Sequence, residues 1–265
     1  MSDWSLKDLQ LWDDRICEIA KENNLDWYPI TYETCDYFEM IGNMAYHGMP
    51  THYGHWSYGK SFEVQHQRYQ LGMTGLPYEL IINSNPCISY LMKENPLYLQ
   101  ILIMAHCVGH SDFFKQNRTF GFTRADTVVP RMRNAKKRIQ SYIEDPSIGI
   151  HKVEDIIDSC HALSYQVPRL PQDIRDIALE RKEWQRANKD ALNKGDMCER
   201  TYHQLPHDSE YDVLGFISAY ARGLNDWEKD IIEIIRDEAH YFMPQIRTKI
   251  MNEGWACFWH FKILN

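Results

Sequence analysis

Apolar side chains recur at helical spacing along most of the chain, and this pattern predicts a mainly α protein. From Ser5 to Glu22 they keep a period of about 3.6 residues, and Ser5 with Asp8 has the pattern of an N-terminal capping box. After a break at Asp26–Pro29, the same reasoning predicts helices over residues 34–44, 88–93, 98–114, 125–144, 152–164, 212–221, 226–242 and 244–260. We expect a single helical domain over residues 1–265.

Three segments depart from this pattern. Tyr78–Ile82 is short and isoleucine-rich, which predicts one small β element. Residues 49–72 are interrupted by glycine and proline but rich in aromatic side chains, which is typical of an irregular loop that lines a pocket. Residues 168–208 are charged and contain three prolines, so we expect a variable or mobile insertion there, with a solvated helix inside it.

Composition and charge narrow the class of protein. Hydrophobic residues make up 44% of the 265-residue chain, enough for a packed globular core. The net charge of −8 argues against nucleic acid or an anionic membrane as partner. The basic stretch at 125–144 is interpreted as a solvated helix face, with phosphate or protein-partner binding as the alternative.

The cysteines and the apolar runs bear on the compartment. The seven cysteines form no C-x-x-C pair, which favours a reducing environment. We recognise no signal peptide, and no apolar run approaches the ~20 residues of a membrane span. The expected location is therefore the cytoplasm.

A histidine pair is the strongest candidate for chemistry. His106 and His110 are four residues apart, so a helix places both imidazoles on one face, where they can bind one metal ion. The apolar run Leu97–Ala105 directly precedes them and predicts that the helix is buried. The alternative is a pair of hydrogen-bonded histidines that only support the core.

A second pair completes the predicted metal site. Glu253 and His260 are seven residues apart, so they share a face of the last predicted helix. Glu253 has apolar neighbours, and a carboxylate in such surroundings is seldom left unpaired. We predict that both are metal ligands; the alternative for Glu253 is a buried salt bridge to Arg236 or Lys249.

Two further acids and a group of polar and aromatic residues are assigned by their surroundings. Glu79 and Glu238 each stand beside apolar residues and are predicted to be the catalytic proton-transfer groups, or additional ligands if two metal ions bind. The aromatic segment and the turn after the predicted strand are expected to bind substrate through four residues, His55, Trp56, Tyr58 and Asn83.

Part of this pattern resembles the gluzincin type of zinc peptidase. Those enzymes bind metal through His-Glu-x-x-His and a later glutamate, often within Asn-Glu-Gly-aromatic-Ala. Here His106 and His110 have the same spacing, and residues 252–256 read Asn-Glu-Gly-Trp-Ala. Cys107 stands where the catalytic glutamate would be, so peptidase chemistry would need another carboxylate as its base.

A broader resemblance covers most of the chain. The blocks at 54–60, 75–92, 104–117, 210–217 and 236–260 are similar, in order, to the bacterial SpoVR family, named for stage V sporulation protein R. The resemblance implies a cytoplasmic protein linked to spore cortex formation or stress responses. Family members usually continue beyond the last block, so we expect a compact or a truncated member.

Three hypotheses of function follow. The first is a zinc hydrolase acting on a small-molecule or peptide amide, such as a cell-wall precursor, with Glu79 or Glu238 as base. The second is a non-haem iron oxidoreductase with the same ligands, including a di-iron form. The third is a non-catalytic regulator of sporulation or stress response. The implied cofactor is a divalent metal ion, zinc or iron.

Overall fold

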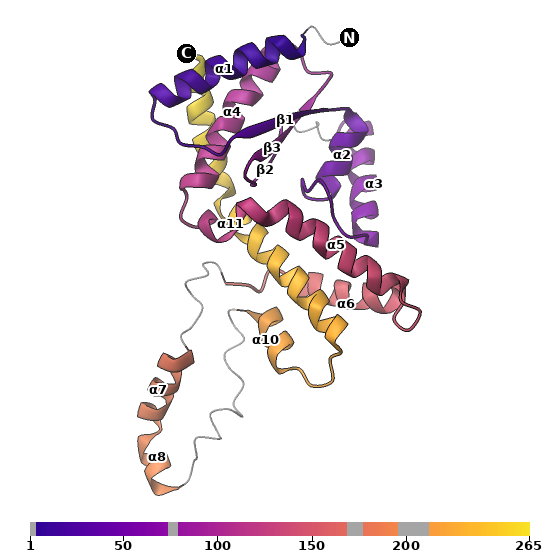
Figure 1. Cartoon of the computed structure of the whole chain (residues 1–265), viewed down its shortest axis with the longest axis vertical. Coiled ribbons are helices and arrows are strands. Elements are labelled where there is room, and N and C mark those ends of the chain that lie inside the picture. Colours follow the sequence, from indigo (N-terminus) through magenta and orange to yellow (C-terminus); the bar gives the residue numbers. More distant parts are fainter. Residues whose placement is uncertain (1–3, 74–78, 169–176, 196–211) are drawn as a thin grey trace. The chain divides into compact units, whose positions relative to one another are not determined.

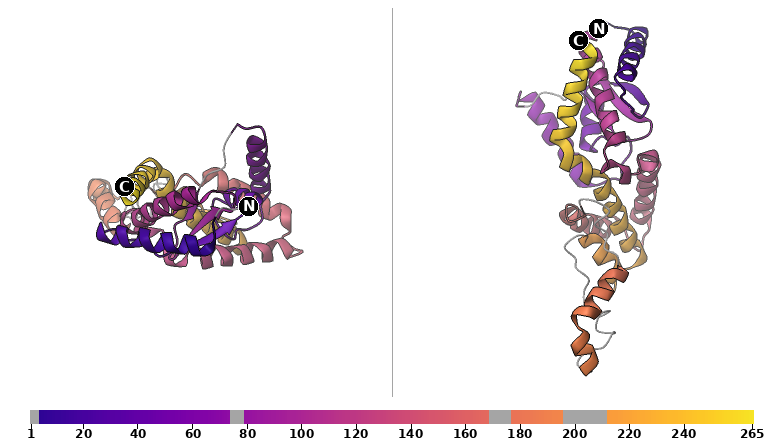
Figure 2. Two further views of the ribbon diagram at one scale, coloured as in Figure 1. Left: turned by 90° about the horizontal axis from the view of Figure 1, so that it is seen from above. Right: turned by 90° about the vertical axis from the view of Figure 1, so that its left-hand side faces the viewer.

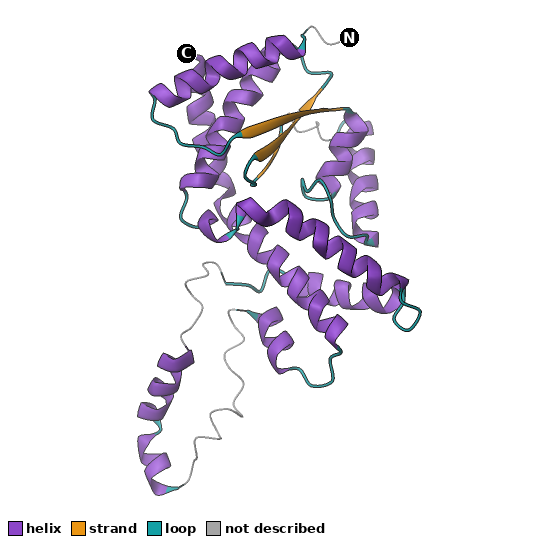
Figure 3. Cartoon of the chain, in the orientation of Figure 1, coloured by secondary structure: helices purple, strands orange, loops and turns teal. Residues whose placement is uncertain are grey.

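The computed structural model describes residues 4–73, 79–168, 177–195 and 212–265, and these are mainly α-helical, as predicted (Figure 3). They group into two compact units, Met1–His151 with Gln245–Asn265, and Lys152–Pro244. The prediction of one domain over 1–265 stays a prediction. Within the described residues, no helix is both long enough and apolar enough to cross a membrane.

The first unit contains a small three-stranded sheet (Figure 1). Its strands are β1 (Ile30–Cys35), β2 (Leu80–Ile82) and β3 (Cys87–Met92), in the order β1-β3-β2. β1 runs parallel to β3, and β2 runs antiparallel to it. The predicted strand near 78–82 is confirmed as β2, whereas β1 was not predicted at all.

The prediction of a helix at 88–93 is wrong, because these residues form most of the central strand. β3 is almost entirely buried, so its sequence shows a continuous apolar run without the alternation that identifies a half-exposed strand. The helix predicted from residue 34 begins later. Residues 34 and 35 end β1, and Asp36 caps α2 (Tyr37–Ala45) through a capping box with Glu39.

Helices α1 (Leu6–Glu22) and α4 (Leu97–Gln116) pack on each other and enclose the main core of the first unit. The capping box of Ser5 and Asp8 is present, as predicted. Buried apolar side chains of both helices meet there: Leu9, Ile16, Ala20, Ile103, Met104, Ala105, Cys107 and Val108. The deeply buried part of α4 extends from this core through both histidines.

The aromatic segment is irregular over residues 49–55, as its glycine and proline residues suggested, but not beyond them. Trp56–Gln70 forms α3, which begins where the His55 side chain accepts from the backbone N–H of Ser57. Gly59 lies inside this helix, where glycine costs only about 1 kcal/mol relative to alanine. Packing of α3 against α2 offsets this cost.

The basic stretch forms α5 (Val128–Glu144), preceded by the 3₁₀ turns Phe120–Phe122 and Ala125–Thr127. One face of α5 is buried through Val128, Met132, Ala135 and Ile139. The cations Arg133, Lys136, Lys137 and Arg138 are exposed, as a solvated helix face requires.

The second unit contains most of α6 (Ile150–Leu163), together with α7 (Ile177–Ala187), α8 (Lys189–Lys194), α10 (Val213–Tyr220) and the first part of α11 (Asp226–Leu264). α7 and α8 confirm the helix predicted inside the 168–208 segment. The prediction that this segment is a mobile insertion falls largely on 169–176 and 196–208, which lie outside the described residues.

α11 corrects the prediction of two helices that meet near residue 243. It is one helix with Pro244 inside it. An internal proline costs roughly 3 kcal/mol, but apolar packing stabilises the helix on both sides of it. Ala239 and Met243 pack with Val167 in the second unit, and Ala256 and Ile263 are buried in the first.

Asp212 organises the second unit at the start of α10. Its carboxylate accepts from the backbone N–H of Gly215 at 2.8 Å and pairs with Arg236, whose Nη2 lies 2.6 Å away. Burial alone would raise the pKa of Asp212, but hydrogen bonds from His240, Arg236 and Gly215 lower it to about 2.

This lowered pKa predicts how acid affects stability. Because the folded state favours the charged form of Asp212, its contribution is present above the unfolded pKa near 3.8 and is lost as the pH falls towards 2. A shift of this size corresponds to about 2 kcal/mol. Asp212→Asn should therefore lower the unfolding free energy at pH 7 by that order in urea titrations. Its deficit should shrink between pH 4 and 2, whereas Asp155→Asn, at an exposed site on α6, should show little deficit at any pH.

Candidate metal centre

Four ionisable side chains from three parts of the first unit converge on one point. Glu79 directly precedes β2, His106 and His110 lie on α4, and Glu253 lies on the second half of α11. Each offers one ligand atom, and these atoms all lie within 4.8 Å of one another. Three of the four predicted metal ligands are therefore brought together, and Glu79 joins them.

The carboxylate oxygens and imidazole nitrogens of this group lie close enough together to bind one metal ion. Glu79 Oε1 lies 3.1 Å from His106 Nε2 and 3.4 Å from His110 Nε2. Glu253 Oε2 lies 3.7 Å from each of the same two nitrogens. The imidazole rings themselves are 4.6 Å apart, as the i, i+4 spacing on a helix requires. Both carboxylates thus face both Nε2 atoms.

His110 is oriented by a hydrogen bond on its far side. Its Nδ1 lies 2.8 Å from Oδ1 of Asn252, which accepts, so the neutral ring carries its proton on Nδ1. Nε2 then presents a lone pair to the two carboxylates. Burial lowers the pKa of His110, but its interactions with Glu79, Asn252 and Glu253 outweigh burial and raise it. This environment favours a cation beside Nε2, either a proton or a metal ion.

The surroundings of His106 also favour a cation beside its Nε2 atom. Its Nδ1 lies 2.8 Å from Nδ1 of His260, while its Nε2 is buried and has no hydrogen-bond partner among the described residues. Glu79 Oε1 approaches this nitrogen to 3.1 Å as an ion-pair contact and not as a hydrogen bond. A buried imidazole nitrogen without a hydrogen bond, facing two carboxylates, fits a divalent metal ion.

Glu79 is held in its charged form. Burial disfavours the carboxylate, but its interactions with the His106 and His110 rings outweigh burial and lower the pKa of Glu79 to about 2. Glu253 is more exposed, with 48% of its side chain accessible. The salt-bridge alternative with Arg236 is not what the structure shows, because Arg236 pairs with Asp212 and Glu233.

A close crossing of α4 and α11 assembles the group. The two helices run side by side in the first unit (Figure 2). A Cβ built on Gly109 would lie 2.8 Å from Cα of Ala256, so a side chain at 109 has no room. Gly109 directly precedes His110, and Ala256 is three residues after Glu253. The absence of a side chain at 109 therefore allows the carboxylate to reach the imidazoles.

A hydrogen bond fixes the same crossing. Trp255 Nε1 donates to Oδ2 of Asp112 at 2.9 Å, and Oδ1 of Asp112 accepts from the backbone N–H of Asp26 at the same distance. Asp112 is buried, so each of these bonds replaces water that the carboxylate has lost.

Trp255→Phe should lower the unfolding free energy by about 1–3 kcal/mol, because it leaves half of a buried carboxylate without its donor. Trp259→Phe is the matched control, one turn further along α11. Trp259 Nε1 is buried without a hydrogen bond among the described residues, so its removal breaks none. Equal losses in urea titrations of the two variants would contradict the importance of the Asp112 bond.

The remaining predicted site residues lie elsewhere. Glu238 is buried in the second unit and is not part of the four-residue group. His260 belongs to a different group, with His106 and Cys257. His55 caps α3, and Trp56 is half exposed. Each of the other two predicted substrate-binding residues has a polar partner outside the four-residue group: Tyr58 with His52 at 3.3 Å, and Asn83 with Thr123 at 2.9 Å.

Cys107 does not replace the missing glutamate of the gluzincin pattern. It is fully buried in the core with α1, and its Sγ lies 3.2 Å from Oγ of Ser89. Burial raises the pKa of this thiol well above its ordinary value, so it stays protonated.

Sequence reasoning missed Asn252, Gly109 and Cys257. Asn252 and Gly109 stand inside the motifs that drew attention to the site. Asn252 is one turn before Ala256 on α11, so helical spacing places both on the face that meets α4. That spacing was the available signal, but nothing in the sequence says which residue of α4 it meets.

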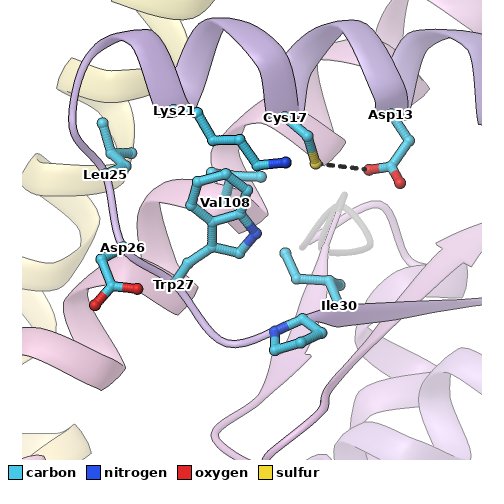
Figure 4. A pocket seen from close by; sticks show the side chains of 9 residues that line it. Asp13, Cys17, Lys21, Leu25, Asp26, Trp27, Ile30 and Val108 are labelled. Carbon is cyan, nitrogen blue, oxygen red and sulfur yellow. Dashed lines mark hydrogen bonds between the residues drawn. The ribbon is translucent and has the colours of Figure 1, made fainter.

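A separate cavity of about 440 Å³ lies beneath α1 (Figure 4). Asp13, Cys17 and Lys21 line it from α1, and Trp27 and Val108 line it from the other side. Val108 is two residues from each histidine, so on α4 it faces away from them. None of the four converging residues lines this cavity.

The described chain is thus a mainly α protein in which two buried histidines face two carboxylates, a group that could hold a divalent cation. It belongs to the family of SpoVR-like proteins, whose model matches residues 3–265. It is 38% identical to the uncharacterized protein YcgB of Escherichia coli (strain K12), over 99% of this chain and 54% of YcgB. The chain therefore spans about half the length of this curated relative. No solved structure matches the chain.

Proposed function

We propose that the chain is a zinc-dependent hydrolase that cleaves a peptide or amide bond. His106, His110 and Glu253 are the metal ligands, and Glu79 is the general base. The buried Nε2 of His106, which has no hydrogen bond but faces two carboxylates, is the observation that carries the proposal. Three protein ligands with one position open to substrate are typical of catalytic rather than structural zinc.

The roles follow from exposure and distance. Bound zinc supplies Lewis-acid activation of water and of the substrate carbonyl. Asn252 holds His110 in the tautomer whose Nε2 can bind metal. Glu79 Oε1 is close to both imidazoles, so it can take the proton of the attacking water and deliver it to the leaving amine. Glu253 lies in the Asn-Glu-Gly-Trp-Ala sequence that resembles the gluzincin ligand pattern, and it completes the ligand set.

A second candidate function is a non-haem iron oxidoreductase. Two histidines and one carboxylate with open positions are also the ligand set of ferrous oxygenases. The presence of two carboxylates against the same two nitrogens is the observation that favours it.

Metal content separates these functions. The full chain is purified without a metal-affinity column and without oxygen, and its metals are measured by elemental mass spectrometry. We expect zinc, with His110→Gln lowering the content by about one ion per chain. Chelation should abolish release of amines from a panel of short peptide amides, and added zinc should restore it.

Three other results would point elsewhere. Iron that is lost in His110→Gln, together with substrate-dependent oxygen consumption, would favour the oxidoreductase. Equal metal contents in the two proteins would exclude His110 as a ligand. A well-folded wild type without metal would contradict both enzymes and leave a regulatory protein whose histidines support the core.

A further inference from the structure

A second group of possible ligands lies next to the first and shares one residue with it. His106, Cys257 and His260 each offer one ligand atom, and these three atoms lie within 4.8 Å of one another. Cys257 and His260 are three residues apart on α11, so they share a helix face. All three residues belong to the first unit.

The two groups use opposite sides of the His106 ring. Nε2 faces Glu79 and Glu253, whereas Nδ1 lies 2.8 Å from Nδ1 of His260. An imidazole whose two nitrogens face separate ligand sets has the arrangement of a bridging ligand, since each nitrogen can bind its own ion.

The chemistry of the second group differs from that of the first. One thiolate and two imidazoles form a softer ligand set than two imidazoles and two carboxylates, and they suit zinc rather than magnesium or calcium. Cys257 is exposed and His260 is partly so. An ion bound there would therefore have three protein ligands and an open position towards solvent.

We propose that Cys257, His260 and Nδ1 of His106 form a second site for a thiophilic divalent cation such as zinc, bridged to the first site by His106. Binding at both sites releases the thiol proton of Cys257 and the remaining ring proton of His106. The proposal goes beyond the hydrolase, which needs no thiolate, and depends on it only for the ion on the other side of His106.

Cobalt(II) is the probe, because a cobalt–thiolate bond produces an intense near-ultraviolet charge-transfer absorption that nitrogen and oxygen ligands do not. Metal-free full-length protein is titrated with cobalt(II), and bound metal is counted after gel filtration. We expect about two ions per chain and the thiolate band. Cys257→Ser and His260→Gln should each bind about one ion less, and Cys257→Ser should abolish the band.

Two variants make the result specific. His110→Gln changes only the first group, so it should lose one ion but keep the band. Cys17→Ser, which removes a half-buried thiol of α1, should lose neither. Cys257 is exposed, so its replacement by serine should leave the circular dichroism spectrum and the urea midpoint unchanged.

Two results would overturn the second site: no thiolate band at saturating cobalt, or a band that persists in Cys257→Ser. In the first case the contact between His106 and His260 is only a hydrogen bond. Either result leaves the hydrolase proposal standing if His110→Gln still loses an ion. Conversely, a band that depends on Cys257, with no ion lost in His110→Gln, would support the second site and contradict the first.

Discussion

Glu79→Gln is expected to keep the zinc content of the wild type while lowering amide hydrolysis by roughly 10²–10⁴-fold. Glutamine has the shape of glutamate but cannot accept a proton from water. Glu79 Oε1 lies within 3.4 Å of both imidazole Nε2 atoms, so the lost group stands beside the reacting water. The measurement is elemental mass spectrometry together with the rate of amine release, on the same preparation.

The matched variant is Glu253→Gln, which changes the other carboxylate that faces the same two nitrogens. As a ligand, Glu253 should be required for binding, so this variant should lose about one zinc ion per chain. If the two variants exchange behaviour, Glu79 is the ligand and Glu253 the base. If both keep zinc and full activity, neither carboxylate takes part and the proposed mechanism is wrong.

Much of the fold was predictable because helical periodicity is a local property. α1 follows directly from its apolar period and capping box, and α4 from its long apolar run. The wrong predictions fall where the local sequence pattern gives no signal or gives a misleading one. β3 is buried on both faces, so its apolar run resembles a short buried helix. Pro244 suggested a helix end, but apolar contacts before and after it stabilise one continuous α11.

In the candidate site, too, the contacts set by helical spacing were predictable and the contacts between distant segments were not. The spacing of His106 and His110 is local, so a helix alone places their rings together. Glu79 and Asn252 meet His110 across 31 and 142 residues of chain, and no local pattern shows such contacts. His260 was predicted on the correct helix face, but the sequence did not show that it meets the other nitrogen of His106.

Local sequence patterns do not predict that α4 and α11 cross closely. This crossing depends on Gly109. Gly109→Ala should lower the unfolding free energy by about 1–3 kcal/mol, because the new Cβ would lie 2.8 Å from Cα of Ala256. That atom belongs to the backbone, so it cannot turn aside as a flexible side chain would. α11 must move away from α4, and Asn252 and Glu253 move with it. Zinc affinity should therefore fall along with stability.

Gly254→Ala is the matched control on α11, because a Cβ there meets nothing within 4 Å. Helix propensity alone favours alanine over glycine by about 1 kcal/mol, so this variant should be slightly stabilised and should bind zinc normally. The same propensity gain applies at Gly109, so a loss of stability there isolates the steric cost of the crossing. Urea titrations and zinc-binding measurements on both variants test this. If Gly109→Ala were as stable as Gly254→Ala and bound zinc equally well, the close approach of the two helices would not be what positions Glu253.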